Sequence, residues 1–262
     1  MFDDLRAWEI TSGSFFVYTA GVTALPRGVV GPKRIRARGA AAGGFSLVCA
    51  SVALPELPII HDWLLPPVLL LLAYWTSGLL FVAPMHGAER LLLRGDNAAR
   101  IRALSAAAPR WIAEFLECAY AGVYLMIPVA LVIHLWLTPA PDPVRFWTVI
   151  LTTDYLCFAA LPWVQTRPPR SLEDGEPWHA RVRRFNLRLL GVTSIDVNTF
   201  PSGHAAEALA AALLVIDAPR PAVVGMFFCA AAVSVGAVLG RYHYAADAAA
   251  GWLVAVIVWL SM

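Results

Sequence analysis

The chain has 262 residues, of which 59% are hydrophobic and only 15% are charged, with a net charge of +2 and a mean hydropathy of +0.65. Soluble domains contain about 25% charged residues, so this composition excludes an ordinary soluble protein and predicts a membrane protein. The cysteines lie in apolar stretches without metal-ligand spacing, which argues against a disulfide framework or a zinc site. They are Cys49, Cys118, Cys157 and Cys229.

A membrane-spanning helix needs roughly 20 apolar residues. The first apolar stretch, residues 14–26, is too short to span, so we expect an interfacial or re-entrant role for it. Seven later stretches are candidate spans, and the first of these is the weakest because it is rich in alanine and glycine. They are residues 39–56, 62–84, 114–137, 145–164, 200–217, 221–239 and 243–261.

Two long polar connections interrupt the candidate spans. Residues 85–113 mix leucine with arginine, which predicts amphipathic helix along the membrane interface, and residues 167–199 form a polar excursion. We find no repeat and no second soluble domain. The predicted fold is therefore all-α: a single polytopic transmembrane helix bundle over residues 1–262, with six core spans, one extra N-terminal span and interfacial amphipathic helices. Residues 1–61 form an N-terminal extension with the weak first span, and residues 114–262 carry the motifs.

The most informative motif is Pro201-Ser202-Gly203-His204, which opens an apolar helix. Pro201 and Ser202 are typical helix-start residues, and Ser202 is placed to cap. Unpaired amides at a helix N-terminus, beside a glycine that leaves the backbone accessible, are suited to binding an anion. His204 lies where it can exchange a proton with that anion. A capped helix with an inert histidine is the alternative interpretation of the motif taken alone.

Ionisable residues near the ends of two other spans form a second and a third cluster. His243 and Asp247 are four residues apart, so the carboxylate can orient the imidazole and leave its other nitrogen free to attack. Arg241 precedes them, and Arg167 and Arg170 follow the span 145–164, where their guanidinium groups match phosphate oxygens. Each cluster also has a structural interpretation, as membrane anchors or a packed pair. The order of the spans, however, brings all three clusters to one membrane face, which favours a common site.

These clusters resemble the motifs of the type-2 phosphatidic acid phosphatase superfamily, which shares its site with vanadium haloperoxidases. Pro201 to His204 match the second motif letter for letter, His243 and Asp247 match the His-x-x-x-Asp of the third, and Arg167-Pro168 match the end of the first. The resemblance covers roughly residues 114–262. The lysine expected in the first motif is replaced by Ala160, and the Ser-Arg pair of the third by Gly236 and Ala237. Arg241 and Arg170 are placed to compensate, and "RPPR" with "RYHYAAD" is similar to an inositol phosphorylceramide synthase-like branch.

The resemblance implies a mechanism in which His243 attacks phosphorus and forms a phosphohistidine, oriented by Asp247. His204 would then protonate the leaving oxygen and activate the incoming water or alcohol. The phosphate oxygens would be stabilised by arginines and helix amides, with no cofactor and no metal ion. These phosphate-binding residues are Arg167, Arg170, Ser202, Gly203 and Arg241. Glu207, one helical turn past Gly203, is a candidate for a supporting role.

The implied function is a membrane lipid-phosphate phosphatase that acts on a phosphomonoester or pyrophosphate. Its alternatives are a phosphotransferase that moves a phospho-headgroup between lipids and a non-catalytic phospholipid-binding relative. The expected partner is a lipid phosphate in the bilayer, with no nucleic acid, and the expected location is a bacterial cell membrane.

Members of the family mostly place their site on the extracytoplasmic face, whereas the basic residues of this chain predict the cytoplasmic face. With seven spans, fifteen basic residues outside the site fall on the site's side, against Arg145 and Arg220 on the other. The fifteen are Arg6, Arg27, Lys33, Arg34, Arg36, Arg38, Arg90, Arg94, Arg100, Arg102, Arg110, Arg181, Arg183, Arg184 and Arg188.

Overall fold

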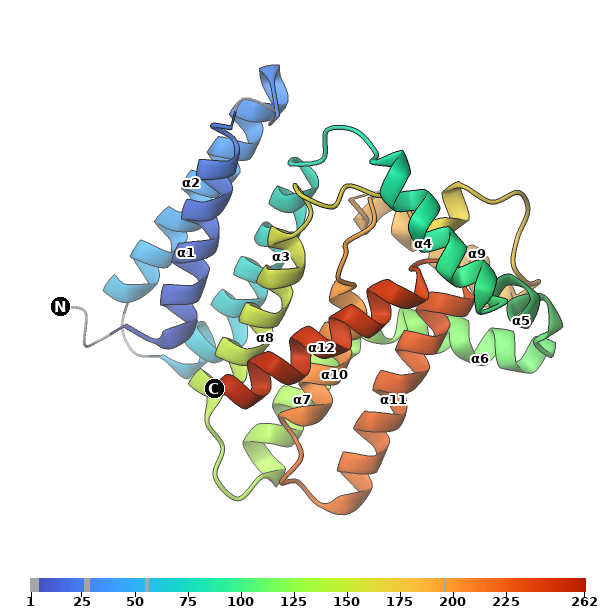
Figure 1. Ribbon diagram of the computed structural model, residues 1–262. Helices are drawn as coiled ribbons and strands as arrows, with labels where there is room; N and C mark the ends of the chain where they lie inside the picture. The colour runs from blue at the N-terminus through green and yellow to red at the C-terminus, as the bar shows by residue number, and fades with distance from the viewer. Residues whose placement is uncertain (1–4, 26–28, 55–56, 196) are drawn as a thin grey trace.

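The computed structural model describes residues 5–25, 29–54, 57–195 and 197–262, and within these ranges it is built from helices and turns without a strand. The all-α prediction is confirmed. Figure 1 shows the elements, which run in the order α1 (Ala7–Val22), α2 (Gly31–Ala53), the π-helical turn η1 (Ile59–Leu64), α3 (Leu65–Gly78), α4 (His86–Ala98), α5 (Ile101–Ala107), α6 (Arg110–Ala121), α7 (Val123–Leu137), α8 (Pro143–Ala159), the 3-10 turn η2 (Pro169–Ser171), α9 (Arg181–Thr193), α10 (Gly203–Leu213), α11 (Arg220–Leu239) and α12 (Ala245–Ser261).

The N-terminal part is an antiparallel hairpin of α1 and α2 (Figure 1). Gly44 of α2 lies so close to Phe16 of α1 that a Cβ atom on the glycine would meet the ring at 2.4 Å. Helix α1 also packs on α8, where Phe15 stacks on Tyr155 with ring centroids 4.5 Å apart. The stretch 14–26 therefore belongs, as far as residue 25, to a continuous helix and the turn that ends it, and its interfacial or re-entrant role stays a prediction.

The predicted count of six core spans plus one is not confirmed. Among the described residues, Ile59–Gly78 and α11 are long and apolar enough to cross a membrane. The stretch 114–137, predicted as one span, is divided between α6 and α7, which bend by 61° at Gly122 and would make a third span if counted together. Helix α2 has sufficient length, but its alanines, glycines and arginines lower its hydropathy. Helix α12 is apolar but has only 17 residues.

Helix α10 is the centre of the bundle, although it has only 11 residues. Nine of these are buried, because its alanines let α7, α8, α11 and α12 approach it from several sides. One close approach is at Gly251 of α12, where a Cβ atom would lie 2.5 Å from the carbonyl oxygen of Ser202. This contact holds the start of α10 beside the start of α12, so the second and third motifs meet.

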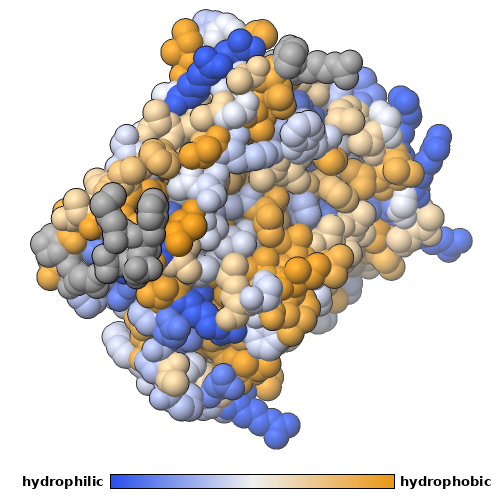
Figure 2. All heavy atoms as spheres, turned by 60° about the vertical axis from the view of Figure 1, so that its left-hand side comes forward, coloured by the Kyte–Doolittle hydropathy of each residue, from blue (hydrophilic) through white to orange (hydrophobic). Residues whose placement is uncertain are grey.

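Shorter helices cover one end of the bundle. Helices α4 and α5 arise within residues 85–113, so the helix predicted there is present, and α9 is a helix in the polar excursion where none was predicted. In Figure 1 these three helices, with α6, lie to the right of the upper part of the bundle, away from the α7–α8 and α10–α11 turns at the bottom. Figure 2 shows hydrophobic side chains over much of one outer face, with the most hydrophilic ones mostly toward its margins, as suits a protein in contact with lipid.

Candidate active site

A cavity of about 560 Å³ extends from the meeting point of the motifs into the bundle. At one end it is lined by the two motif histidines, Gly203 and Arg170, and toward the other by apolar and aromatic side chains of η1, α3, α7 and α8. The apolar part includes Trp63, Leu70, Leu71, Ile127, Leu131, Trp147 and Phe158. The cavity thus combines a polar end that can hold an anion with a wall that can hold a hydrocarbon chain.

The start of α10 is capped as the sequence predicts, but most of its amides are already bonded. Ser202 is the N-cap, and its hydroxyl accepts from the Ala205 amide at 3.4 Å. The Ser202 amide itself donates to the carbonyl oxygen of Asp247 at 3.0 Å, and the Gly203 amide donates to the Thr199 hydroxyl at 3.4 Å. Among the described residues, only the His204 amide of this turn has no hydrogen-bond partner. Of the backbone amides predicted to bind an anion, the His204 amide is therefore the one that remains available in this turn.

The imidazole of His204 faces that of His243, with ring centroids 6.1 Å apart and the planes nearly perpendicular. Tyr120 and Tyr124, from either side of the α6–α7 bend, each meet the His204 ring edge to face at 5.7 Å. Both histidines line the cavity. The bend at Gly122 therefore brings two aromatic rings to His204 that fix its orientation, which one straight helix would not do.

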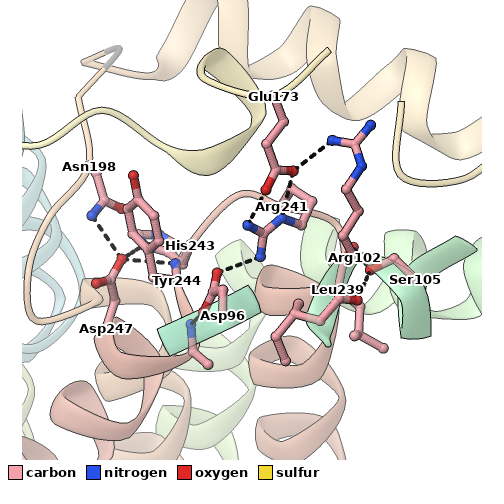
Figure 3. A network of polar contacts seen from close by, with 12 residues as sticks. Asp96, Arg102, Ser105, Glu173, Asn198, Leu239, Arg241, His243, Tyr244 and Asp247 are labelled. Atoms are coloured by element: carbon pink, nitrogen blue, oxygen red, sulfur yellow. Dashed lines mark hydrogen bonds and ion pairs between the residues drawn. The ribbon is translucent and has the colours of Figure 1, made fainter. Parts of the chain in front are cut away.

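His243 lies in the turn before α12, not on the helix itself, so the predicted shared helical face is wrong in detail. Asp247 is nevertheless beside it, with 3.5 Å between His243 Nδ1 and Asp247 Oδ2. The same oxygen accepts from Asn198 Nδ2 at 2.8 Å and from the Tyr244 amide at 3.0 Å (Figure 3). Asn198 is held in turn by Thr166, which its side chain and its amide both contact. The carboxylate is therefore fixed next to Nδ1, and Nε2 is the nitrogen left for chemistry.

Arg170 is the arginine that the structure places in the cavity wall. Its guanidinium carbon lies 5.3 Å from the centroid of the Tyr242 ring, and its amide donates to the Arg241 carbonyl at 3.0 Å. Tyr242 is fixed by stacking on Tyr120 at 4.0 Å and by donating to Glu117 at 2.7 Å. In the described part of the chain no carboxylate forms an ion pair with Arg170, so its donors are available to an anion.

Arg167, the arginine of the first motif, is held by Glu89 of α4. Its Nε and Nη2 donate to the two carboxylate oxygens at 2.9 and 3.0 Å, and its amide donates at 3.0 Å. These hydrogen bonds from Arg167 lower the pKa of Glu89 to about 2 despite its burial. The guanidinium does not line the cavity. The structure therefore does not bring Arg167 to the other predicted phosphate ligands, because its guanidinium group is paired with the Glu89 carboxylate of α4.

Arg241, expected to replace the missing family arginine, is also turned away from the cavity. It is 1% exposed and has a positive φ of 61°. Its Nη1 contacts Asp96 at 2.5 Å, and its Nε and Nη2 contact Glu173 at 3.0 and 2.6 Å (Figure 3). Arg241 therefore does not lie where it could replace the missing family arginine: the helix ends at Leu239, so Arg241 is not one turn along the same face as Ala237.

Several residues that shape the site lie outside the three sequence motifs. Asn198 orients Asp247, and the carboxylates Glu89, Asp96 and Glu173 decide which arginines are neutralised. Asp154 of α8 lines the cavity. The sequence could have indicated this residue, because a lone carboxylate in an apolar stretch is a candidate functional residue. Among the described residues, no group of three or more His, Cys, Asp or Glu side chains is arranged to hold a metal ion.

The comparisons with known proteins agree with the motifs. The family model described as PAP2 superfamily matches residues 89–261, about two thirds of the chain. The chain belongs to the PAP2 superfamily. No curated protein and no solved structure matches it. Membership supports phosphatase or phosphotransferase activity and, with the apolar helices, fits a membrane protein. The matched region begins at Glu89, so the family region of this PAP2 protein includes most of α4 and all of α5, ahead of the core expected from residue 114.

Proposed function

We propose that the protein is a lipid-phosphate phosphatase of the cell membrane that works through a phosphohistidine on His243. The observation that supports this best is the pairing of His243 with His204 at the polar end of a cavity that has a large apolar and aromatic part. A phosphate held between the two rings would have the Arg170 guanidinium and the His204 amide available for its oxygens, with its hydrocarbon chain in the apolar part. Family membership provides the reaction class.

The proposed reaction has two displacements at phosphorus. His243 Nε2 attacks as the bond to the leaving oxygen breaks, and His204, which takes up a proton as the phosphate anion binds beside it, gives that proton to the leaving oxygen. His204 then takes a proton from water, whose oxygen displaces His243 and releases phosphate. Asp247 stabilises the imidazolium that forms on His243, as the acid does in other triads. Arg170 stabilises the equatorial oxygens, which makes it the main phosphate-binding side chain in this proposal.

An alcohol in place of water would make the same residues a phosphotransferase, and the test therefore includes an acceptor. Purified protein in detergent is assayed for phosphate release from a panel of lipid phosphates, with and without long-chain alcohols and in excess chelator. We expect hydrolysis that survives the chelator and disappears in His243→Ala and His204→Ala variants that keep their thermal unfolding temperature. Activity retained by His243→Ala would contradict the assignment of the nucleophile. Loss of wild-type activity in chelator, restored by magnesium, would contradict the metal-free mechanism.

The basic residues support a site on the cytoplasmic face, with one change to the count. The hairpin is antiparallel, so Arg6 lies at the opposite end from Lys33, which donates to the Phe81 carbonyl near the loop that carries the site. Arg27 lies outside the described residues, and most of the other counted residues lie on helices at the site's end. The test is labelling with a membrane-impermeant thiol reagent in His179→Cys, with the native cysteines replaced. Protection in intact cells is expected, and ready labelling from outside would overturn the orientation.

A further inference from the structure

A buried carboxyl in the cavity wall has no role in the proposed mechanism. Asp154 is 1% exposed, and neither of its side-chain oxygens has a hydrogen-bond partner in the described part of the protein. Its Oδ1 lies 3.4 Å from the point where a Cβ atom on Gly203 would be, so it is beside the first turn of α10. A polar group buried without a partner is unfavourable, and native proteins keep few of them.

A second carboxyl shares this part of the cavity. Glu207 follows His204 by three residues on α10, which places the two side chains next to each other on the helix surface. Both Asp154 and Glu207 line the cavity, and they are close enough to interact electrostatically. Around them the wall is formed by Phe158, Tyr124 and other apolar or aromatic side chains. Two adjacent carboxyls in such surroundings destabilise the empty protein, which is the usual cost of a binding site.

A carboxyl keeps at least one accepting oxygen in either protonation state, so each of these groups can pair with a partner that donates a hydrogen bond. The described part of the protein supplies no hydrogen-bond donor to Asp154. Because Asp154 lines the cavity, a ligand bound in the cavity can supply that donor. We infer that Asp154 and Glu207 form an acceptor subsite for a hydroxyl or N–H group that the lipid carries on the carbons next to its phosphate. This inference rests on the proposed function, because it places the phosphate between His204 and His243. Lipid phosphates whose neighbouring carbons carry only esters or hydrocarbon would leave both carboxyls unpaired.

The test compares two lipid phosphates that differ in one group. They are 1-oleoyl-glycerol 3-phosphate and its 2-deoxy analogue, 3-oleoyloxypropyl phosphate, and only the first carries a hydroxyl near the phosphate. We expect wild-type kcat/KM to favour the hydroxylated lipid by at least about tenfold, since a lipid without the hydroxyl leaves a buried polar group unpaired. The same preference is expected in the thermal stabilisation of the His243→Ala variant, which requires binding but no turnover. If wild type turns over neither lipid but the hydroxylated lipid still gives the larger thermal stabilisation, the proposed function is contradicted and the acceptor subsite is not.

Variants then test the carboxyl itself. Asp154→Leu should bring the ratio of the two kcat/KM values to near one and leave the unfolding temperature unchanged or higher, because it removes a buried polar group that has no partner in the described part of the protein. Thr153→Val is the matched control, since Thr153 is a fully buried neighbour on α8 that does not line the cavity, and its ratio should equal that of wild type. A wild-type ratio near one in both turnover and binding would overturn the inference. A lower unfolding temperature of Asp154→Leu with an unchanged ratio would overturn it as well, since the carboxyl would then be structural.

Discussion

Replacing Arg241 tests whether this arginine stabilises the fold or binds the phosphate. Its guanidinium makes three contacts with Asp96 and Glu173 and is 1% exposed. Removing one partner of a buried ion pair costs about 3–5 kcal/mol, because the remaining charges stay buried without compensation. Asp96 keeps the Ala245 amide at 3.0 Å, and Glu173 keeps Arg102 at 3.0 Å. We therefore expect Arg241→Met to lower the free energy of unfolding by an amount near the lower end of this range, about 3 kcal/mol.

For a chain of this size each kcal/mol corresponds to roughly 2–4 °C, so the unfolding temperature of Arg241→Met should fall by about 6–12 °C. The assay is thermal unfolding in detergent, together with kcat/KM on a lipid phosphate measured well below the transition. Arg102→Met is the matched control, since Arg102 contacts the same Glu173 with a side chain that is 42% exposed. Such an exposed pair contributes about 0–1 kcal/mol, and its loss should shift the transition by no more than about 4 °C.

At the assay temperature, the folded Arg241→Met protein should keep its kcat/KM within about tenfold of wild type, because the side chain does not line the cavity. Combining Arg241→Met with Asp96→Asn should cost less than the sum of the two single changes, since both remove the same ion pair. The opposite result would refute this interpretation. An unchanged unfolding temperature with a loss of several hundredfold in kcat/KM would make Arg241 a phosphate ligand, as the sequence alone suggested.

Three further predictions follow the same geometry. Arg170→Ala should lower kcat/KM by about 100-fold or more with little change in unfolding temperature. A large fall in the unfolding temperature together with the loss of activity would contradict a role at the phosphate. Gly251→Val should destabilise the protein by about 1–3 kcal/mol in a denaturant titration, since its Cβ would lie 2.5 Å from the Ser202 carbonyl oxygen; wild-type stability would show that α12 shifts freely. The Glu89 carboxyl has a lowered folded pKa, so its contribution to stability is full above about pH 4.5 and declines as the pH falls toward 2. Unfolding followed between these values should show a shallower loss in Glu89→Gln, and parallel curves would exclude this linkage.

Local sequence determines the helical content and the chemistry at the ends of helices. An apolar, charge-poor chain satisfies its backbone most simply as helices, which is why the all-α prediction holds. The N-cap of Ser202 and the contact of His243 with Asp247 depend on residues within four positions of each other, so spacing predicts both even though His243 precedes the helix. The family assignment depends on the same short motifs, and the PAP2 match confirms it.

Which arginine faces the cavity was decided only by the tertiary structure. Arg167, Arg170 and Arg241 look equivalent in the sequence, but the carboxylates that neutralise two of them come from other parts of the chain. Glu89 is 78 residues from Arg167, and Asp96 is 145 residues from Arg241. No local pattern encodes such pairings, because they depend on where α4 packs against the start of α12.

The predicted number of spans was not confirmed for a related reason. Hydropathy shows that a stretch is apolar, and in α10 the apolar side chains are buried against neighbouring helices, so 11 residues are enough to fill the centre of the bundle. The bend between α6 and α7 likewise follows from packing, since Tyr120 and Tyr124 turn toward His204 from its two sides. Burial by protein and burial by lipid favour the same residues, and only the arrangement of the helices distinguishes the two.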